Sequence, residues 1–373
     1  MSTLAFFPWL RLDADLAVRG YTLVQYRRRR RPFGRDRARQ EVIDAVLEPY
    51  WESRGVSVPV ATLVQVSDHK LTEQLAHEEI AKLFEFGSLV AFCALAACEY
   101  LDHWYWNRDN LQLIVQSFDD PKAGVYVETR RRHGGSGHAM PQDYFVVSRP
   151  INISGDEVKI DVPLLEALLD ASDHAVWPRV REAIEIFNLA SSEASSISEW
   201  TELVLMNGAF ERLFESPGKE DVLAAGLTAT LQPEETLPPE RLAKIATNAE
   251  AAARFRRALS VREVWIRDLF RVRNEYAHGV MSSRYPALWS VREHLLLASF
   301  AFPLAVKSVL ATSGIYALSY EDQLHVNAFE ALAREDHLTS QQERPRWRRI
   351  INDVARKQSL RAFINDLRET GPA

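Results

Sequence analysis

Cysteine is nearly absent from this sequence, since Cys93 and Cys98 are the only two among 373 residues. Both lie in an apolar run, where a buried free thiol is more typical than a disulfide. So few cysteines exclude a disulfide-stapled secreted scaffold and a paired Cys-x-x-Cys metal site. We therefore expect a reducing compartment and a cytoplasmic protein.

Long apolar runs are missing as well. The uncharged run from Phe86 to Cys98, at 13 residues, is as long as any in the chain. A membrane-crossing helix needs about 20 apolar residues, so we expect no membrane span. The apolar segment from Leu4 to Leu10 lacks the basic start and the cleavage region of a secretory leader, so we expect no signal peptide.

Several catalytic and cofactor signatures are also absent. The ten histidines are scattered and include no His-Glu-x-x-His pair, so we expect no metal site. No Gly-x-x-x-x-Gly-Lys phosphate loop occurs, and the glycines at 134, 135 and 137 lack the strand-to-helix setting of a dinucleotide site. A Gly-x-Ser-x-Gly nucleophile elbow is missing too. These absences predict a protein without a cofactor.

The N-terminal part alternates strand and helix patterns, in a chain of ordinary composition with a mild net charge of -6. β-branched and aromatic runs predict strands at 21–26, 59–66, 111–118, 124–128 and 144–147. Helical periodicity predicts helices over 37–51 and 71–101. We expect an α+β domain over residues 1–150 that senses a trigger, binds RNA or restrains the rest of the chain.

Strand patterns largely stop after Pro163, so the fold class is mainly α. Helices are predicted over 164–172, 178–193, 198–215, 238–279 and 286–311, with a long connection over 217–239 and a kink at Pro303. Four principal helices favour an antiparallel four-helix bundle over residues 160–315. Two or three further helices are expected in a C-terminal helical extension, residues 316–373.

A short polar motif, Arg273-Asn274-x-x-x-His278, closes the third of these principal helices and is followed by Gly279. Glycine is typical just past a helix C-terminus. Asn274 and His278 share a helical face, and Arg273 lies to one side of it. Histidine moves protons near neutral pH and arginine forks onto phosphate, so the trio suits RNA cleavage without a metal. The same residues are also common at an ordinary helix end.

The motif resembles the Arg-polar-x-x-x-His core of HEPN domains. The segments at 188–190 and 202–211 also resemble the first two helices of HEPN proteins of bacterial anti-phage defence, and the resemblance extends over residues 178–312. It implies a HEPN-like bundle that acts as a metal-independent endoribonuclease, with a composite site across a homodimer or higher homo-oligomer. A toxin-like role in abortive infection and a phage-derived trigger are implied as well.

The resemblance also implies roles for the motif residues. His278 would deprotonate the ribose 2′-OH or protonate the leaving oxygen, Arg273 would hold the phosphate, and Asn274 would orient a ribose hydroxyl or the phosphate. The products would end in a 2′,3′-cyclic phosphate or its 3′-phosphate. The alternative is a catalytically silent HEPN-like module that binds RNA or a protein partner.

Two arginine runs are candidate RNA-binding segments: Arg27, Arg28, Arg29, Arg30, Arg31, Arg130, Arg131 and Arg132. Phosphate contacts dominate nucleic-acid affinity, and residues 1–40 hold ten Arg against three Asp. Alternate residues of a strand point to opposite faces, however, so a solvated strand is the other interpretation. The aromatics at 104–106 would either stack on bases or fill the core.

Two further residues are candidate supports for the motif. Glu211 lies four residues after Asn207 on a helix expected to face the motif helix, and its carboxylate can orient His278. An exposed or arginine-paired glutamate is the alternative. His294 lies early in the next helix and can face the same cleft, although a lone histidine between Glu293 and Leu295 is more often structural.

Overall fold

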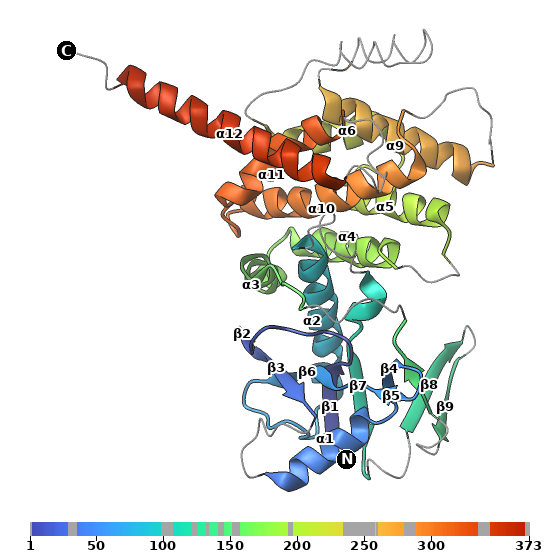
Figure 1. The fold of residues 1–373 in the computed structure, drawn as a ribbon. Coiled ribbons are helices and arrows are strands. Elements are labelled where there is room, and N and C mark those ends of the chain that lie inside the picture. The colour runs from blue at the N-terminus through green and yellow to red at the C-terminus, as the bar shows by residue number, and fades with distance from the viewer. Residues whose placement is uncertain are drawn as a thin grey trace. The chain divides into compact units, whose positions relative to one another are not determined.

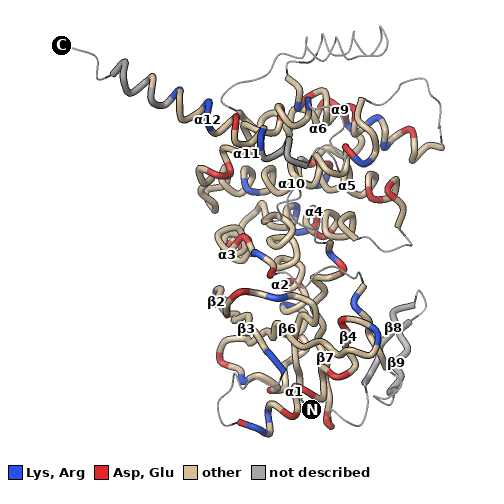
Figure 2. The backbone as a smooth tube through the Cα atoms, in the orientation of Figure 1, with Lys and Arg blue, Asp and Glu red and all other residues tan. Residues whose placement is uncertain are grey.

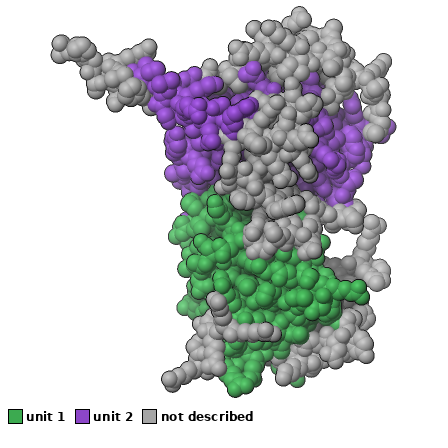
Figure 3. Space-filling view, viewed as in Figure 1, with its two compact units in different colours: residues 1–98, 106–169 green, residues 99–105, 170–373 purple. Residues whose placement is uncertain are grey.

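The computed structural model describes residues 2–28, 36–97, 107–120, 125–131, 134–140, 145–150, 157–192, 197–233, 258, 260–279, 288–334 and 344–369. The chain forms two compact units, coloured separately in Figure 3. Unit 1 holds residues 1–98 and 106–169, and unit 2 holds residues 99–105 and 170–373. All described strands belong to unit 1, and helices dominate the chain, so the fold is mainly α with some β.

Unit 1 is built on a five-stranded antiparallel sheet in the order β2-β3-β6-β1-β7 (Figure 1). Its strands are β1 (Ser2–Phe7), β2 (Leu16–Val18), β3 (Tyr21–Arg27), β6 (Val60–Val66) and β7 (Ile114–Phe118). The predicted strands at 21–26 and 59–66 are confirmed and pair with each other. β1 was not predicted: Ala5 lies opposite both Val64 and Val115, and a strand buried on both faces reads as an apolar run without alternation.

Two smaller sheets complete the β structure. One contains β4 (Tyr50–Ser53), β5 (Val56–Ser57) and β10 (Val147–Ser148), and the other is the hairpin of β8 (Val125–Arg131) and β9 (Gly134–Met140). A short 3-10 helix, η1 (Arg108–Leu111), precedes β7. The predicted strand at 124–128 is confirmed but extends through Arg131.

The helices of unit 1 are α1 (Arg37–Leu47), α2 (His77–Ala96) and α3 (Val162–Asp170). The prediction for α1 was too long, because Pro49 has no N–H to donate to a helical carbonyl and β4 begins at Tyr50. The prediction for α2 started too early, because the Ala76 N–H donates to the Glu79 carboxylate at 2.7 Å and so caps the helix there.

The apolar end of α2 carries the first cysteine. Cys93 is a buried free thiol, as predicted. Cys98 and the aromatics at 104–106 lie outside the described residues.

The regular secondary structure of unit 2 is all helical in its described residues (Figure 1). Its elements are η3 (Ala171–Asp173), α4 (Trp177–Ala190), α5 (Glu199–Leu213), α6 (Glu220–Thr230), α9 (Val261–Ala277), α10 (Val291–Thr312), α11 (Tyr320–Leu332) and α12 (Arg344–Glu369). The buried ring of Trp265 on α9 lies edge-on to Phe210 and Phe329 and joins α5, α9 and α11 in one core. Each of these three helices therefore contributes an aromatic ring to this core.

One prediction for unit 2 was wrong, because α6 occupies part of the segment expected to be a connection. Glu220 and Asp221 stand in its first turn, where acidic side chains stabilise a helix. α6 packs against α9. With α6 included, the helix that carries the motif follows three described principal helices of unit 2 rather than two. The predicted helix start at 238 and Pro286 lie outside the described residues.

The longest apolar helix of unit 2 is α10. By length and composition alone it could cross a membrane, but 67% of its most apolar window is buried inside the protein. Pro303 lies inside this helix and is itself buried. These features are consistent with a core helix of a soluble protein.

Candidate functional site

The Arg-Asn-x-x-x-His motif lies at the C-terminal end of α9. The His278 N–H donates to the Asn274 carbonyl at 3.0 Å, and the Gly279 N–H donates to the Tyr276 carbonyl at 3.1 Å. Gly279 has a φ of +68°, a conformation that glycine adopts without strain, so the predicted glycine stop is confirmed. The exposed His278 therefore stands just beyond the last helical residue.

Arg273 is held by two acceptors. Its Nη2 donates to Oε2 of Glu211 at 2.5 Å, and its Nη1 donates to Oδ1 of Asn274 at 2.7 Å. The guanidinium also lies over the Phe270 ring, 5.7 Å from its centroid. Among the described residues, no side chain forms a hydrogen bond or an ion pair with the His278 imidazole.

Glu211 was expected either to orient His278 or to be exposed or paired with an arginine. In the structure it pairs with Arg273. Its side chain is 11% exposed and that of Arg273 is 21% exposed, so the pair is largely shielded from water. Asn207, one turn earlier on α5, is fully buried with no hydrogen-bond partner for either amide atom. The amide therefore belongs to the interior of unit 2.

All four arginines of α9 are paired with carboxylates, and Figure 2 shows basic and acidic residues interleaved along this helix. The pairs are Arg262 with Glu330, Arg267 with Glu263, Glu220 and Asp221, Arg271 with Glu220, and Arg273 with Glu211. Burial alone would lower the pKa of Arg267, but hydrogen bonds to its three carboxylates outweigh this effect and raise the pKa. The positive charges of the α9 arginines are thus neutralised by carboxylates of the same chain.

An aromatic pair that the sequence did not reveal joins α5 to the motif. The rings of Trp200 and Tyr276 are stacked, with centroids 5.2 Å apart and planes 12° apart. Both side chains are only partly buried. Because the two residues are far apart in the chain, only the packing of α5 on α9 brings them together.

His294 is a core residue and does not reach the exposed motif. It is fully buried, and its Nε2 lies 3.2 Å from Oδ2 of Asp268 on α9. The same oxygen of Asp268 accepts the Leu288 N–H at 2.9 Å. His294 therefore has the structural role that was the alternative interpretation: its contact with Asp268 joins the start of α10 to α9.

Part of the two arginine runs lies outside the described residues: Arg29, Arg30, Arg31 and Arg132. Arg27 is exposed at the end of β3, whereas Arg28 forms ion pairs with Glu48 and Asp44. In β8, Arg130 pairs with Gly135 and Arg131 with Gly134, so the backbone of both belongs to a strand. Of the first run, the described arginines thus offer one exposed side chain and one that is already paired.

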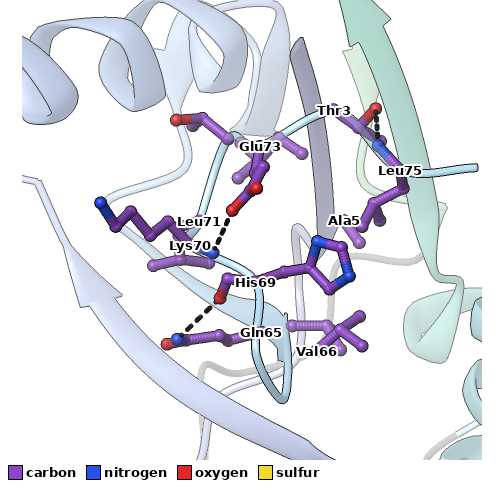
Figure 4. A pocket seen from close by; sticks show the side chains of 12 residues that line it. Thr3, Ala5, Gln65, Val66, His69, Lys70, Leu71, Glu73 and Leu75 are labelled. Carbon is purple, nitrogen blue, oxygen red and sulfur yellow. Dashed lines mark hydrogen bonds between the residues drawn. The ribbon is translucent and has the colours of Figure 1, made fainter.

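A shallow pocket lies in unit 1 between β1, the end of β6 and the loop that follows it (Figure 4). The His69 Nε2 lies 2.9 Å from the Glu79 carboxylate, and the Leu75 N–H donates to Oγ1 of Thr3 at 3.4 Å. The Lys70 ammonium extends away from the His69 ring (Figure 4). These contacts hold the loop against β1 and the first turn of α2, so the pocket results from the packing of this loop.

The motif end of α9 remains the best candidate site, because it combines an exposed imidazole, a guanidinium, an amide and an aromatic pair. Its chemistry suits an anionic substrate that stacks on aromatic rings. The chain matches no protein-family model, no curated protein and no solved structure.

Proposed function

We propose that this chain is a metal-independent endoribonuclease of the HEPN class. The observation that carries the proposal is the hydrogen bond between Arg273 and Asn274 on the last turns of α9, with the exposed His278 one turn beyond Asn274. An imidazole and a permanent cation at one helix end are the groups that attack of a ribose 2′-OH on phosphorus requires.

The reaction would proceed by attack of the ribose 2′-oxygen on the adjacent phosphorus, with loss of the 5′-oxygen of the next nucleotide. His278 would take the 2′-OH proton or protonate the leaving oxygen. Arg273 would stabilise the charge on the phosphorane-like transition state, and Asn274 would orient a ribose hydroxyl or the phosphate. The products would be a 2′,3′-cyclic phosphate and a 5′-hydroxyl.

A single His278 does not easily serve as both acid and base in one step. The proposal therefore includes a homodimer or higher homo-oligomer in which two copies of His278 share one cleft. It also includes a cytoplasmic, toxin-like effector in anti-phage defence that answers a phage-derived trigger. Unit 1 would sense that trigger, bind RNA or restrain the nuclease.

A second candidate function is a catalytically silent HEPN-like module that binds RNA or a protein partner. The pairing of every α9 arginine with a carboxylate favours it, because these charges are already neutralised without a phosphate. This alternative predicts binding that survives the loss of His278 and yields no cleaved product.

Cleavage of labelled RNA in EDTA by the purified full chain separates the two functions. We expect His278→Ala and Arg273→Ala each to lower the rate by about 100-fold or more. Matched controls are His174→Ala, which removes another exposed histidine of unit 2, and Arg292→Ala, which removes an arginine that is 71% exposed and paired with Glu199. Equal rates for wild type and all four variants would refute catalysis by the motif.

A further inference from the structure

The Arg273 guanidinium donates one hydrogen bond to a carboxylate of its own chain. The 2.5 Å contact from Nη2 to Glu211 uses a donor that would otherwise bind a phosphate oxygen, because carboxylates and phosphates occupy the same positions on an arginine fork. Nη1 is taken by Asn274, and Nε is buried with no hydrogen-bond partner. Two of its five N–H donors are thus taken and a third is buried, so an incoming phosphate must compete with these acceptors for the guanidinium.

Glu211 is fixed from its other side as well. Its Oε1 accepts the Gly218 N–H at 3.1 Å, and its main-chain carbonyl accepts the Ser216 N–H at 2.9 Å. Gly218 has a φ of +66°, so the turn after α5 is shaped to aim this N–H. The carboxylate is thus held in place by the turn and does not merely happen to touch Arg273.

We propose that Glu211 is an internal anionic competitor that keeps Arg273 from binding an RNA phosphate until the carboxylate is displaced. The effect of Glu211 on cleavage rests on the proposed function. The competition itself concerns only the binding of an anion to Arg273. A phosphate that approaches Arg273 is repelled by the Glu211 charge and must replace its hydrogen bond. Glu211 is in this sense a regulatory residue of the motif.

A purely positioning role for Glu211 makes a different prediction. A residue that only orients Arg273 would weaken RNA binding or cleavage when altered. Glu211→Gln keeps the size of the side chain and an oxygen acceptor for the Gly218 N–H but removes the charge. The sign of its effect therefore separates competition from positioning.

The test measures binding of a fluorescent single-stranded RNA with 2′-O-methyl riboses, which cannot be cleaved by 2′-OH attack. We expect Glu211→Gln to bind this probe about 10-fold more tightly than wild type, since hydrogen bonds to charged groups are worth about that factor. The dependence of log K on log salt should steepen by about 0.7, as for one added phosphate contact on a single strand. Both gains should vanish in the double variant with Arg273→Ala.

A matched control is Glu215→Gln, which removes the same charge from the turn just after α5. Glu215 is exposed and pairs with Arg179 at 2.8 Å, so this variant should leave probe binding unchanged. Should Glu211→Gln not fold, as judged by thermal unfolding, Glu211→Asp replaces it. That variant keeps the charge but draws the carboxylate back by one methylene, and we expect a smaller gain in the same direction.

Three results would overturn the competition: unchanged or weaker binding by the Glu211 variants, an equal gain in Glu215→Gln, or a gain that persists without Arg273. The binding readout stays valid if the wild type cleaves no RNA, in which case only the ribonuclease proposal fails. Conversely, cleavage that depends on His278, with no tighter binding by Glu211→Gln, refutes the competition and leaves the ribonuclease standing.

Discussion

The rings of Trp200 and Tyr276 lie face to face, 5.2 Å between centroids, and join the first turn of α5 to the last turn of α9. Tyr276 stands between Asn274 and His278 in the sequence. The stacked pair therefore places a partly buried aromatic surface on the helix end that carries the proposed catalytic residues. Nucleic-acid bases use such surfaces without regard to sequence.

Removal of this aromatic surface should weaken RNA binding. We expect Trp200→Ala to lower affinity for single-stranded RNA by about 10-fold, since one stacked base contributes about 1–3 kcal/mol. Trp200→Phe keeps a ring and should retain most of the affinity. Fluorescence anisotropy with a labelled oligonucleotide measures both, and Tyr320→Ala, at a tyrosine that is 67% exposed, is the control. An equal loss of affinity in Tyr320→Ala would contradict RNA binding by the Trp200–Tyr276 pair.

Asp268 should be needed for the stability of unit 2. Its carboxylate serves both the buried His294 and the Leu288 N–H, so Asp268→Ala leaves two polar groups without an acceptor. Each such loss costs about 1–3 kcal/mol. We expect a clear drop in the midpoint of urea unfolding, while Asp173→Ala, at an exposed aspartate, should change little. Equal midpoints for both variants would refute this stabilising role of Asp268.

Acid should destabilise the protein partly through Asp322. Burial would raise the pKa of this carboxyl, but Lys307 and Ser319 lower it below its ordinary value of 3.8. A lowered folded-state pKa stabilises the protein above about 3.8, and this stability is lost as the pH falls through the folded pKa. The free energy of unfolding of Asp322→Asn should therefore depend less on pH below about 4 than that of wild type.

The same substitution tests the pair at neutral pH. Lys307 Nζ lies 2.5 Å from Asp322 Oδ1, and both side chains are largely buried. Loss of one partner of a buried pair typically costs about 3–5 kcal/mol. Urea unfolding at pH 7 and pH 3 measures both effects. A parallel pH dependence in wild type and Asp322→Asn would show that this carboxyl contributes nothing.

Two helical glycines should respond in opposite directions to alanine. A Cβ at Gly226 of α6 would lie 2.6 Å from Cγ of Phe214, whereas a Cβ at Gly208 of α5 would meet only Ile186, at 3.9 Å. We expect Gly226→Ala to destabilise unit 2 by about 1–3 kcal/mol through overpacking. Gly208→Ala should stabilise it by about 0.5–1 kcal/mol. Thermal unfolding of the two variants side by side is the measurement, and equal signs would contradict the packing of α6 on Phe214.

Much of the fold could be predicted from local pattern. Strands β3 and β6, the starts of α4 and α5, and the stop of α9 at Gly279 follow from β-branched runs, helical periodicity and a C-terminal glycine. Strand β1, which lies between β6 and β7, was missed because burial on both faces removes the alternation that marks a strand. Helix α6 was missed because nearby prolines and glycines suggested a connection.

The candidate site was predictable only in part. Arg273, Asn274 and His278 are close in sequence, so their common location follows from one helix end. The Arg273 pairing with Glu211 and the stacking of Trp200 on Tyr276 depend on how α5 packs against α9. No periodicity specifies that packing in advance. His294 looked like a candidate because sequence spacing does not reveal burial.

The most direct test of the proposed chemistry is the identity of the ends left on an RNA cut in EDTA. Wild type should leave a 2′,3′-cyclic phosphate and a 5′-hydroxyl, and a single 2′-deoxy nucleotide at the cleaved position should abolish the cut, because the attacking 2′-oxygen is missing. His278→Ala should leave the same RNA intact. A 3′-hydroxyl with a 5′-phosphate, cleavage at the 2′-deoxy position, or no cleavage by wild type would contradict the account.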